Sequence, residues 1–194
     1  MALGTAAIIG LALLAGAAGK KTGQVVLKKL AKEKMAWLNQ FMPVAERVCR
    51  QYGVPPQVCV AQAALESGWG KKAGGFNYFG MKGEGSAGSQ SWATQEVKSG
   101  QRVAIKASFA KFASMDDALH AYCKMLTQNE NFKPAMQMFQ KEPARFVTWL
   151  WGMGYATALD YPHTLIGVMR TLYRATGDHS YNVQQCRCSA HLHK

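Results

Sequence analysis

The chain has 194 residues, of which 48% are hydrophobic, so it is long enough for one domain of ordinary size with a buried core. It carries 23 Lys and Arg against 11 Asp and Glu, which gives a formal net charge of +12. This excess predicts an anionic partner, such as nucleic acid, an acidic lipid surface or a polymer with free carboxylates. No DNA- or RNA-binding motif accompanies the charge, so we expect no specific nucleic-acid binding.

The first 24 residues form an arm that is distinct from the rest of the chain. Residues 2–19 carry no charged side chain, and a lysine-rich stretch follows at residues 20–34. The apolar segment is just long enough to span a bilayer, and its small residues suit signal cleavage, although no basic residue precedes it. Three interpretations stay open: a membrane-inserting or helix-packing arm, a signal peptide, and a buried core helix. The basic stretch indicates contact with a membrane surface or an assembly.

The central part of the chain begins with two predicted helices. Residues 25–53 have apolar side chains at helical spacing, with Gly53 as a stop and Pro43 as a point where the helix splits or kinks. The stretch VPPQVCVAQAALESG then predicts a helix with proline in its first turn that ends near Gly68. Residues 68–90 are rich in glycine and predict a loop.

The next segment, residues 91–112, changes to strand character. Alternating and β-branched residues surround the tripeptide KSG, which predicts a β-hairpin with Gly100 in its turn. The fold class is therefore mainly α with a small β lobe. The stretch ALESGWG lies where the two parts meet.

Helical periodicity returns after the hairpin. Ser114 is the predicted N-cap of a helix, so Asp116 and Asp117 are expected to stabilise its first turn rather than to act in catalysis. Two more helices are predicted at residues 134–152 and 161–176.

The cysteine count of five is odd, so at least one thiol has no partner within the chain. Three of the cysteines fall in apolar, helical contexts and are predicted to be buried thiols: Cys49, Cys59 and Cys123. The polar tail, residues 179–194, holds two cysteines and two histidines: Cys186, Cys188, His191 and His193. Their C-x-C and H-x-H spacings are tighter than those of usual zinc sites, so they are weak metal candidates. We expect no metal and no cofactor.

Glu66 is the acidic residue that most needs an explanation. It lies at the end of an apolar helix, where unsatisfied carbonyl groups disfavour a carboxylate, and Trp69 and Phe76 lie near enough in sequence to exclude water. Both effects raise the pKa of a carboxyl group, which is the property of a general acid at neutral pH. The residues alone leave a second interpretation open, a glutamate that caps the loop amides after Gly68.

Cleavage of a glycosidic bond usually requires a second carboxylate across the bond. Of the few acids, Glu84 and Glu96 belong to the loop and the hairpin. Glu96 shares one strand face with Trp92, and an aromatic side chain beside an acid suits a sugar ring. The alternative for Glu96 is a solvated residue that pairs with a neighbouring basic side chain.

Five stretches occur in an order that is similar to one known family: AQAALESGWG, NYFGMKG, TQEVKSGQRV, FAKFASMDDALHAYCKML and GYATALDYPHTL. Together they span roughly residues 40–176 and resemble the glucosaminidase domains of glycoside hydrolase family 73, which include flagellar-rod and autolysin enzymes that cut peptidoglycan. The resemblance implies a lysozyme-like helical domain with a β lobe, which we place at residues 25–178. It also implies endo-acting hydrolysis of the β-1,4 bond after N-acetylglucosamine, with no cofactor.

The resemblance also implies roles for individual residues. Glu66 matches the general acid, Glu96 the partner acid on the hairpin, and Tyr155 the tyrosine that orients the substrate or the water. An ordinary core tyrosine remains the alternative for Tyr155. The residues expected to bind substrate lie in the loop and on the hairpin: Trp69, Asn77, Phe79, Gly80 and Trp92. One departure stands out, because the chain continues GYAT with Ala-Leu-Asp-Tyr where the family usually has Asp-Pro.

The expected partner is the glycan strand of peptidoglycan, and the expected location is the periplasm or cell envelope. Delivery by a virion, a flagellar or a secretion assembly would account for a local cut in the wall. Two alternatives are kept: a lytic transglycosylase or muramidase of similar fold, and a structural component that binds glycan or penetrates the membrane.

Overall fold

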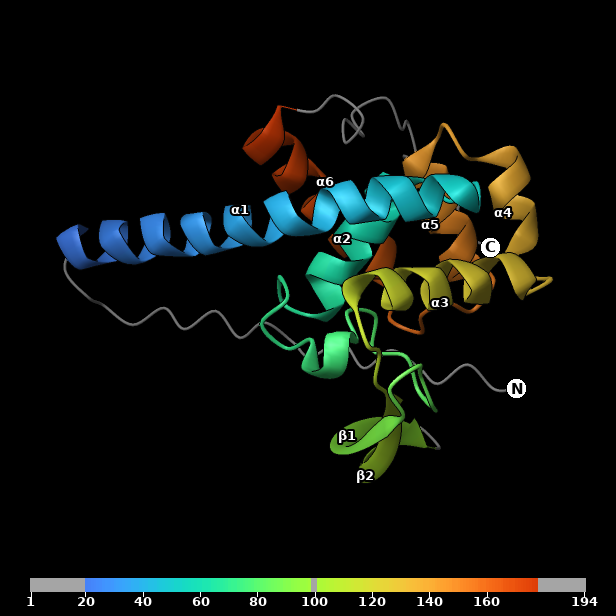
Figure 1. The fold of residues 1–194 in the computed structure, drawn as a ribbon. Coiled ribbons are helices and arrows are strands. Elements are labelled where there is room, and N and C mark those ends of the chain that lie inside the picture. Colours follow the sequence, from blue (N-terminus) through green and yellow to red (C-terminus); the bar gives the residue numbers. More distant parts are fainter. Residues whose placement is uncertain (1–19, 99–100, 178–194) are drawn as a thin grey trace.

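The computed structural model describes the backbone of residues 20–98 and 101–177 and the side chains of residues 32–93 and 105–177 (Figure 1). The arm at residues 2–19 and the four candidate ligands of the tail lie outside the described residues. Within them the fold is mainly helical with one two-stranded antiparallel sheet, which confirms the predicted fold class.

The long helix α1, Lys20–Gln51, extends well beyond the rest of the body on one side (Figure 1). Its second half packs into the core through buried side chains at helical spacing: Leu38, Phe41, Ala45, Val48 and Cys49. Pro43 lies on the exposed side inside this helix and does not split it, which corrects one of the two predicted outcomes. None of the helices in the described part of the chain has the length and apolar character of a membrane span.

Helix α2, Pro56–Glu66, is the central helix of the body. Every residue from position 58 to position 64 is buried, because the helix contacts α1, α5 and α6. Its proline at the first turn matches the prediction, since a missing N–H costs nothing there. The last residue of this central helix is Glu66.

Four further helices complete the helical body in the described part of the chain. They are α3, Met115–Gln128; α4, Lys133–Met138; α5, Pro143–Gly152; and α6, Tyr161–Thr176. The single helix predicted over residues 134–152 is therefore two helices. Pro143 begins the second one, because proline disfavours helical geometry at the residue before it.

The hairpin stands off the helical body on the side of α3 (Figure 1). Strand β1, Ser89–Lys98, pairs antiparallel with β2, Gln101–Ala110, from Ser89 opposite Ala110 to Lys98 opposite Gln101. The predicted turn residue Gly100 lies outside the described residues. At the base, the Gln90 side-chain Nε2 donates a hydrogen bond of 2.7 Å to the carbonyl oxygen of Gly74, which ties the lobe to the loop after Glu66.

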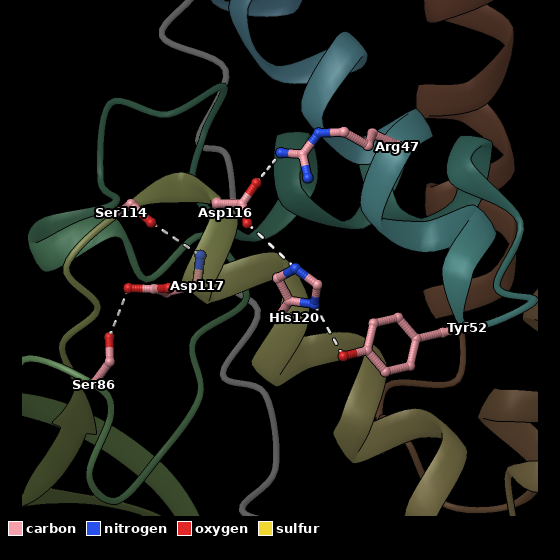
Figure 2. Close-up of polar contacts among 7 residues, drawn as sticks. All are labelled: Arg47, Tyr52, Ser86, Ser114, Asp116, Asp117 and His120. Atoms are coloured by element: carbon pink, nitrogen blue, oxygen red, sulfur yellow. Dashed lines mark hydrogen bonds and ion pairs between the residues drawn. The ribbon is translucent and has the colours of Figure 1, made fainter.

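The start of α3 is anchored by its cap (Figure 2). The Asp117 backbone N–H donates to the Ser114 hydroxyl oxygen at 3.0 Å, which confirms the predicted N-cap. The Asp117 carboxylate accepts a hydrogen bond of 3.1 Å from the Ser86 hydroxyl, so it also holds the loop that precedes β1.

A second set of polar contacts joins α3 to α1 (Figure 2). Asp116 forms an ion pair with Arg47 of α1 and lies 3.3 Å from Nε2 of His120. Nδ1 of His120 lies 2.9 Å from the hydroxyl of Tyr52, which follows α1. Both aspartates lie in the first turn of α3, as predicted, and their side chains hold this helix to α1 and to the loop before β1.

Candidate active site

Glu66 is placed by an abrupt helix end. The backbone turns out of α2 through three consecutive residues with positive φ: Gly68 at +58°, Trp69 at +63° and Gly70 at +80°. Glycine adopts this conformation freely, whereas tryptophan adopts it only when its surroundings hold it there. The Trp69 N–H closes the turn with a hydrogen bond of 2.8 Å to the carbonyl oxygen of Ala64.

The loop after Glu66 is held by α1. The Trp69 ring meets the Trp37 ring edge-on with centroids 5.9 Å apart, and Nζ of Lys34 lies 4.6 Å from the centre of the Trp69 ring. Lys71 in the same loop forms an ion pair of 2.6 Å with Glu33. These contacts hold Trp69 in its unusual backbone conformation, so its side chain serves to fix the turn beside Glu66.

The carboxyl group of Glu66 has the properties predicted from the sequence. Burial raises its pKa from 4.5 to about 7, which confirms the predicted direction. Its Oε1 atom is buried and has no hydrogen-bond partner among the described residues. A buried carboxyl oxygen without a partner is uncommon in a structural role, and it suits a group that exchanges a proton with a ligand.

Tyr155, which follows α5, lies near enough to Glu66 for the charge of that carboxyl group to act on its phenol. Gly154, with φ of +86°, turns the chain at the end of α5, and the Tyr155 N–H donates to the carbonyl oxygen of Leu150 at 2.9 Å. Burial, and then the negative charge of Glu66, raises the pKa of the Tyr155 phenol. The structure thus brings Glu66 and Tyr155 together, and the phenol keeps its proton at neutral pH.

A buried polar network lies behind these two residues, and the sequence prediction missed it. The Tyr122 hydroxyl donates to Oε1 of Gln62, and Nε2 of Gln62 donates to the Tyr161 hydroxyl oxygen at 2.9 Å. The rings of Tyr155 and Tyr161 lie 5.8 Å apart. One signal was present in the sequence: Gln62 interrupts an apolar run four positions before Glu66, on the same helix face.

Asn77, predicted to bind substrate, has its side chain committed to the backbone. Its Nδ2 donates to the carbonyl oxygens of Met81 at 2.8 Å and Ala110 at 3.0 Å, and its Oδ1 accepts from the Met81 N–H at 2.9 Å. These bonds fasten the loop to the end of β2.

Phe79 and Gly80 follow in the same loop. Phe79 is 4% exposed and stacks on Tyr122 with ring centroids 3.9 Å apart, so its side chain belongs to the core. Gly80 is exposed and has a φ of +61°, a conformation that favours glycine. Substrate binding by residues 77–80 stays a prediction, and it would involve the exposed part of the loop.

On the hairpin side, Trp92 is 41% exposed and covers the loop at Gly74. A Cβ atom added to Gly74 would lie 2.4 Å from the Trp92 ring, so the indole packs closely on this backbone. Glu96 lies opposite Val103 in the sheet, and its side chain is outside the described part of the structure. Its predicted role as partner acid stays a prediction.

The sequence departure after GYAT, residues 158–161, runs from the surface into the core. The Trp151 indole Nε1 donates to the Ala158 carbonyl oxygen at 2.9 Å, which fixes this connection, and Leu159 is 87% exposed. Tyr161, the last of the altered residues, is fully buried and belongs to the polar network beside Tyr155.

Comparison with known proteins agrees with this geometry. The family model described as mannosyl-glycoprotein endo-beta-N-acetylglucosaminidase, Glucosaminidase for short, matches residues 42–174, more than half of the chain. The chain belongs to the glucosaminidase family. Its helical body with a small antiparallel sheet is the lysozyme-like fold of that family.

Two curated relatives and one solved structure illustrate the relationship. The chain is 33% identical to the peptidoglycan hydrolase FlgJ of Pseudomonas aeruginosa over 145 residues, 70% of this chain and 36% of FlgJ. It is 31% identical to the exo-glucosaminidase LytG of Bacillus subtilis, covering 71% of this chain and 51% of LytG. The catalytic domain of the autolysin Auto from Listeria monocytogenes superposes with a TM-score of 0.66 at 28% identity, over 84% of this chain and 98% of that domain. The chain thus spans about a third of the length of this FlgJ and about half of the length of LytG.

Two further features of this glucosaminidase domain lie outside the constellation around Glu66. One is a surface pocket of about 350 Å³ between the loop at residues 81–86, the end of β2 and α3, and none of the predicted catalytic residues lines it. The other is a group of three buried cysteines in the core, the one set of side chains in the described part of the chain that could hold a metal ion.

Proposed function

We propose that this chain is a peptidoglycan hydrolase that cuts the β-1,4 bond after N-acetylglucosamine. The observation that carries the proposal is the Glu66 carboxyl group, which is buried, has a pKa raised to about 7 and leaves one oxygen without a partner among the described residues. Membership of the glucosaminidase family supports the same reaction class. FlgJ of Pseudomonas aeruginosa, a relative, is named a peptidoglycan hydrolase, which supports the choice of polymer.

In the proposed reaction, Glu66 is the general acid. At neutral pH a substantial fraction of its carboxyl groups carries a proton, because burial raises its pKa to about 7. The protonated oxygen donates to the glycosidic oxygen as the bond to the anomeric carbon breaks. The helix end, the turn at Trp69 and the contacts with α1 keep the carboxyl group in a fixed position.

Tyr155 acts as a neutral hydrogen-bonding group in this scheme. Burial and the charge of Glu66 raise the pKa of its phenol, so it does not serve as a base. Its hydroxyl group is suited to orient the acetamido group of the sugar or the attacking water. Glu96 is the proposed acid across the bond, where it would position that water or stabilise the positive charge at the anomeric carbon.

The proposed location is the cell envelope, where the substrate lies. We also propose that the chain contacts a membrane or an assembly through residues 2–19 and the basic stretch at residues 20–34. The chain would then open the wall locally while that assembly forms. Removal of residues 1–24 tests this part, because a loss of membrane or assembly association is expected only if the arm makes the contact.

The reaction is tested by digesting purified peptidoglycan and identifying the products by mass spectrometry. We expect products with reducing N-acetylglucosamine ends from the wild-type chain and none from Glu66→Gln, with both proteins folded by circular dichroism. An exposed glutamate on α1 provides the matched control, so Glu46→Gln should give the wild-type products.

Other product patterns would contradict the proposal. Anhydromuramic ends would identify a lytic transglycosylase, and reducing muramic ends a muramidase. Release of single terminal N-acetylglucosamine units alone would indicate an exo-acting enzyme, as the name of LytG states for that relative. Full activity of Glu66→Gln would remove Glu66 from the reaction.

A further inference from the structure

The core holds three cysteine side chains that the proposed reaction does not use. Cys49 comes from α1, Cys59 from α2 and Cys123 from α3, and all three are buried as the sequence predicts. Their sulfur atoms lie within 4.8 Å of one another, and those of Cys49 and Cys123 are 3.7 Å apart. The sequence did not show that these thiols, far apart in the chain, converge on one point.

The surroundings favour neutral states of this cluster over a bound metal ion. The three thiols belong to a core of buried hydrophobic side chains. Three thiolates around a divalent ion would leave a net negative charge there, and structural zinc usually takes a fourth ligand. Burial, followed by hydrogen bonding to Cys123, raises the pKa of Cys49 and of Cys59, which opposes the deprotonation that metal binding requires. A disulfide is neutral and needs no fourth ligand.

We propose that Cys49 and Cys123 form a disulfide bond that joins α1 to α3 in an oxidising envelope, while Cys59 remains a thiol. The two sulfur atoms are already in contact at 3.7 Å, so a shift of less than about 2 Å brings them to bonding distance. The location rests on the proposed function, because disulfides persist in envelope compartments and are rare in the cytosol.

The contacts between α1 and α3 support the choice of this pair (Figure 2). Arg47 and Tyr52 lie on either side of Cys49 in sequence, and they contact Asp116 and His120, which precede Cys123 on α3. The same two helices are thus held together by polar contacts at the surface and by the thiol pair in the core.

The bond forms by exchange with a disulfide-bearing oxidant, either a thiol–disulfide oxidoreductase or oxidised glutathione. Hydrogen bonding to Cys49 and Cys59 lowers the pKa of Cys123, which makes its sulfur the first nucleophile. The Cys123 thiolate attacks the oxidant disulfide and releases one thiol. When the core opens locally, burial no longer raises the pKa of Cys49, so Cys49 loses its proton to water, attacks the Cys123 sulfur and releases the second thiol. The chain loses two electrons and two protons, and the oxidant gains them. Because the sulfur atoms are buried in the folded chain, an oxidant can reach them only while the chain folds or when the core opens locally.

The bond would enclose the part of the chain that carries Glu66. Cys49 and Cys123 are 74 positions apart, and the segment between them includes α2, the loop and the whole hairpin. Closing such a loop restricts the unfolded chain and so stabilises the folded state. Tyr155 lies outside the closed segment.

Peptide mapping of the full chain tests the proposal. The protein is unfolded, refolded with a mixture of reduced and oxidised glutathione, alkylated, digested and analysed by mass spectrometry without reduction. We expect a linked peptide that joins Cys49 to Cys123 and a free, alkylated Cys59. The melting temperature should be roughly 10 °C higher than after refolding with dithiothreitol, and reduction should reverse the shift.

Three variants separate this pair from its neighbour. Cys59→Ala is the matched control and should keep the shift in melting temperature, whereas Cys49→Ala and Cys123→Ala should lose it. The proposal is overturned if the chain gives no Cys49–Cys123 peptide, if Cys59 or a tail cysteine takes part in the link instead, or if reduced protein retains one zinc ion with all three thiols protected. These measurements do not use wall cleavage, so a failure here is distinct from a failure of the proposed function.

Discussion

The two sides of the candidate site are held in different ways. Glu66 lies at the end of a helix that is buried along most of its length and contacts three other helices. Glu96 lies on a two-stranded ribbon, where the described contacts with the body are at its base, through Gln90 and Trp92 of β1 and through the end of β2 at Ala110. A proton donor requires low water content and a fixed position, which the helical side provides. The hairpin side is joined to the body only at its base in the described part of the chain.

The largest expected effect separates the two acids. Glu66→Gln should lower the turnover rate on purified peptidoglycan by at least ~10³-fold, because it removes the only proton that the scheme transfers to the leaving oxygen. Glu96→Gln should lower it by ~10- to 100-fold, because an amide can still hold a water molecule. The measurement is the initial rate of turbidity loss at saturating substrate. Equal losses would show that the hairpin acid matters as much as the helical one.

Gln62→Leu tests whether the buried network supports the helical side. The variant leaves the hydroxyl groups of Tyr122 and Tyr161 without their amide partner, so we expect a loss of about 2 kcal/mol in the free energy of unfolding. The turnover rate should fall ~10-fold with KM unchanged, since Tyr161, whose ring lies beside that of Tyr155, loses its hydrogen bond to Gln62. Gln57→Leu, on the same helix but outside the network, is the control. Wild-type stability and rate in Gln62→Leu would contradict this role.

The raised pKa of Glu66 predicts a dependence of stability on pH. Its pKa is about 7 in the folded chain against an ordinary 4.5, so the folded state binds the proton more tightly. Stability should therefore fall as the pH rises from about 4.5 to about 7, and it should stay low above that range.

Glu66→Gln should remove this fall. At about pH 8 the variant should be more stable than the wild type by about 1–3 kcal/mol, and at about pH 4 the two should be nearly equal. Urea denaturation at the two pH values measures the difference, with the exposed Glu46→Gln as control. A difference that does not depend on pH would mean that Glu66 is not desolvated.

The smallest expected effect concerns the base of the hairpin. Gly74→Ala places a methyl group 2.4 Å from the present position of the Trp92 ring, so the exposed indole must move. If this ring stacks on a sugar, KM should rise ~2- to 5-fold while kcat stays the same. Gly167→Ala is the control, because a Cβ there has no neighbour within 4 Å. An unchanged KM would remove Trp92 from substrate binding.

The sequence determined the local elements and the chemistry of single residues. Proline at the first turn of α2, serine before α3 and the alternating residues of the hairpin specify their own backbone geometry, so these elements could be predicted. Glu66 could be predicted as a residue with a raised pKa, because an acid at the end of an apolar helix is desolvated wherever that helix packs. The proposed role of Tyr155 came from the ordered stretches of family resemblance.

Only the tertiary structure decided which residues from distant parts of the sequence lie close together in space. Gln62 and three tyrosines from separate segments converge behind Glu66, and three cysteines from three helices converge in the core. The tertiary structure also directs the Asn77 side chain to the backbone of β2, and it stacks the Phe79 ring on Tyr122. Residue spacing along the chain fixes one helix face or one strand face at a time. The meeting of faces depends on how whole helices pack, which is set by the burial of many apolar side chains together.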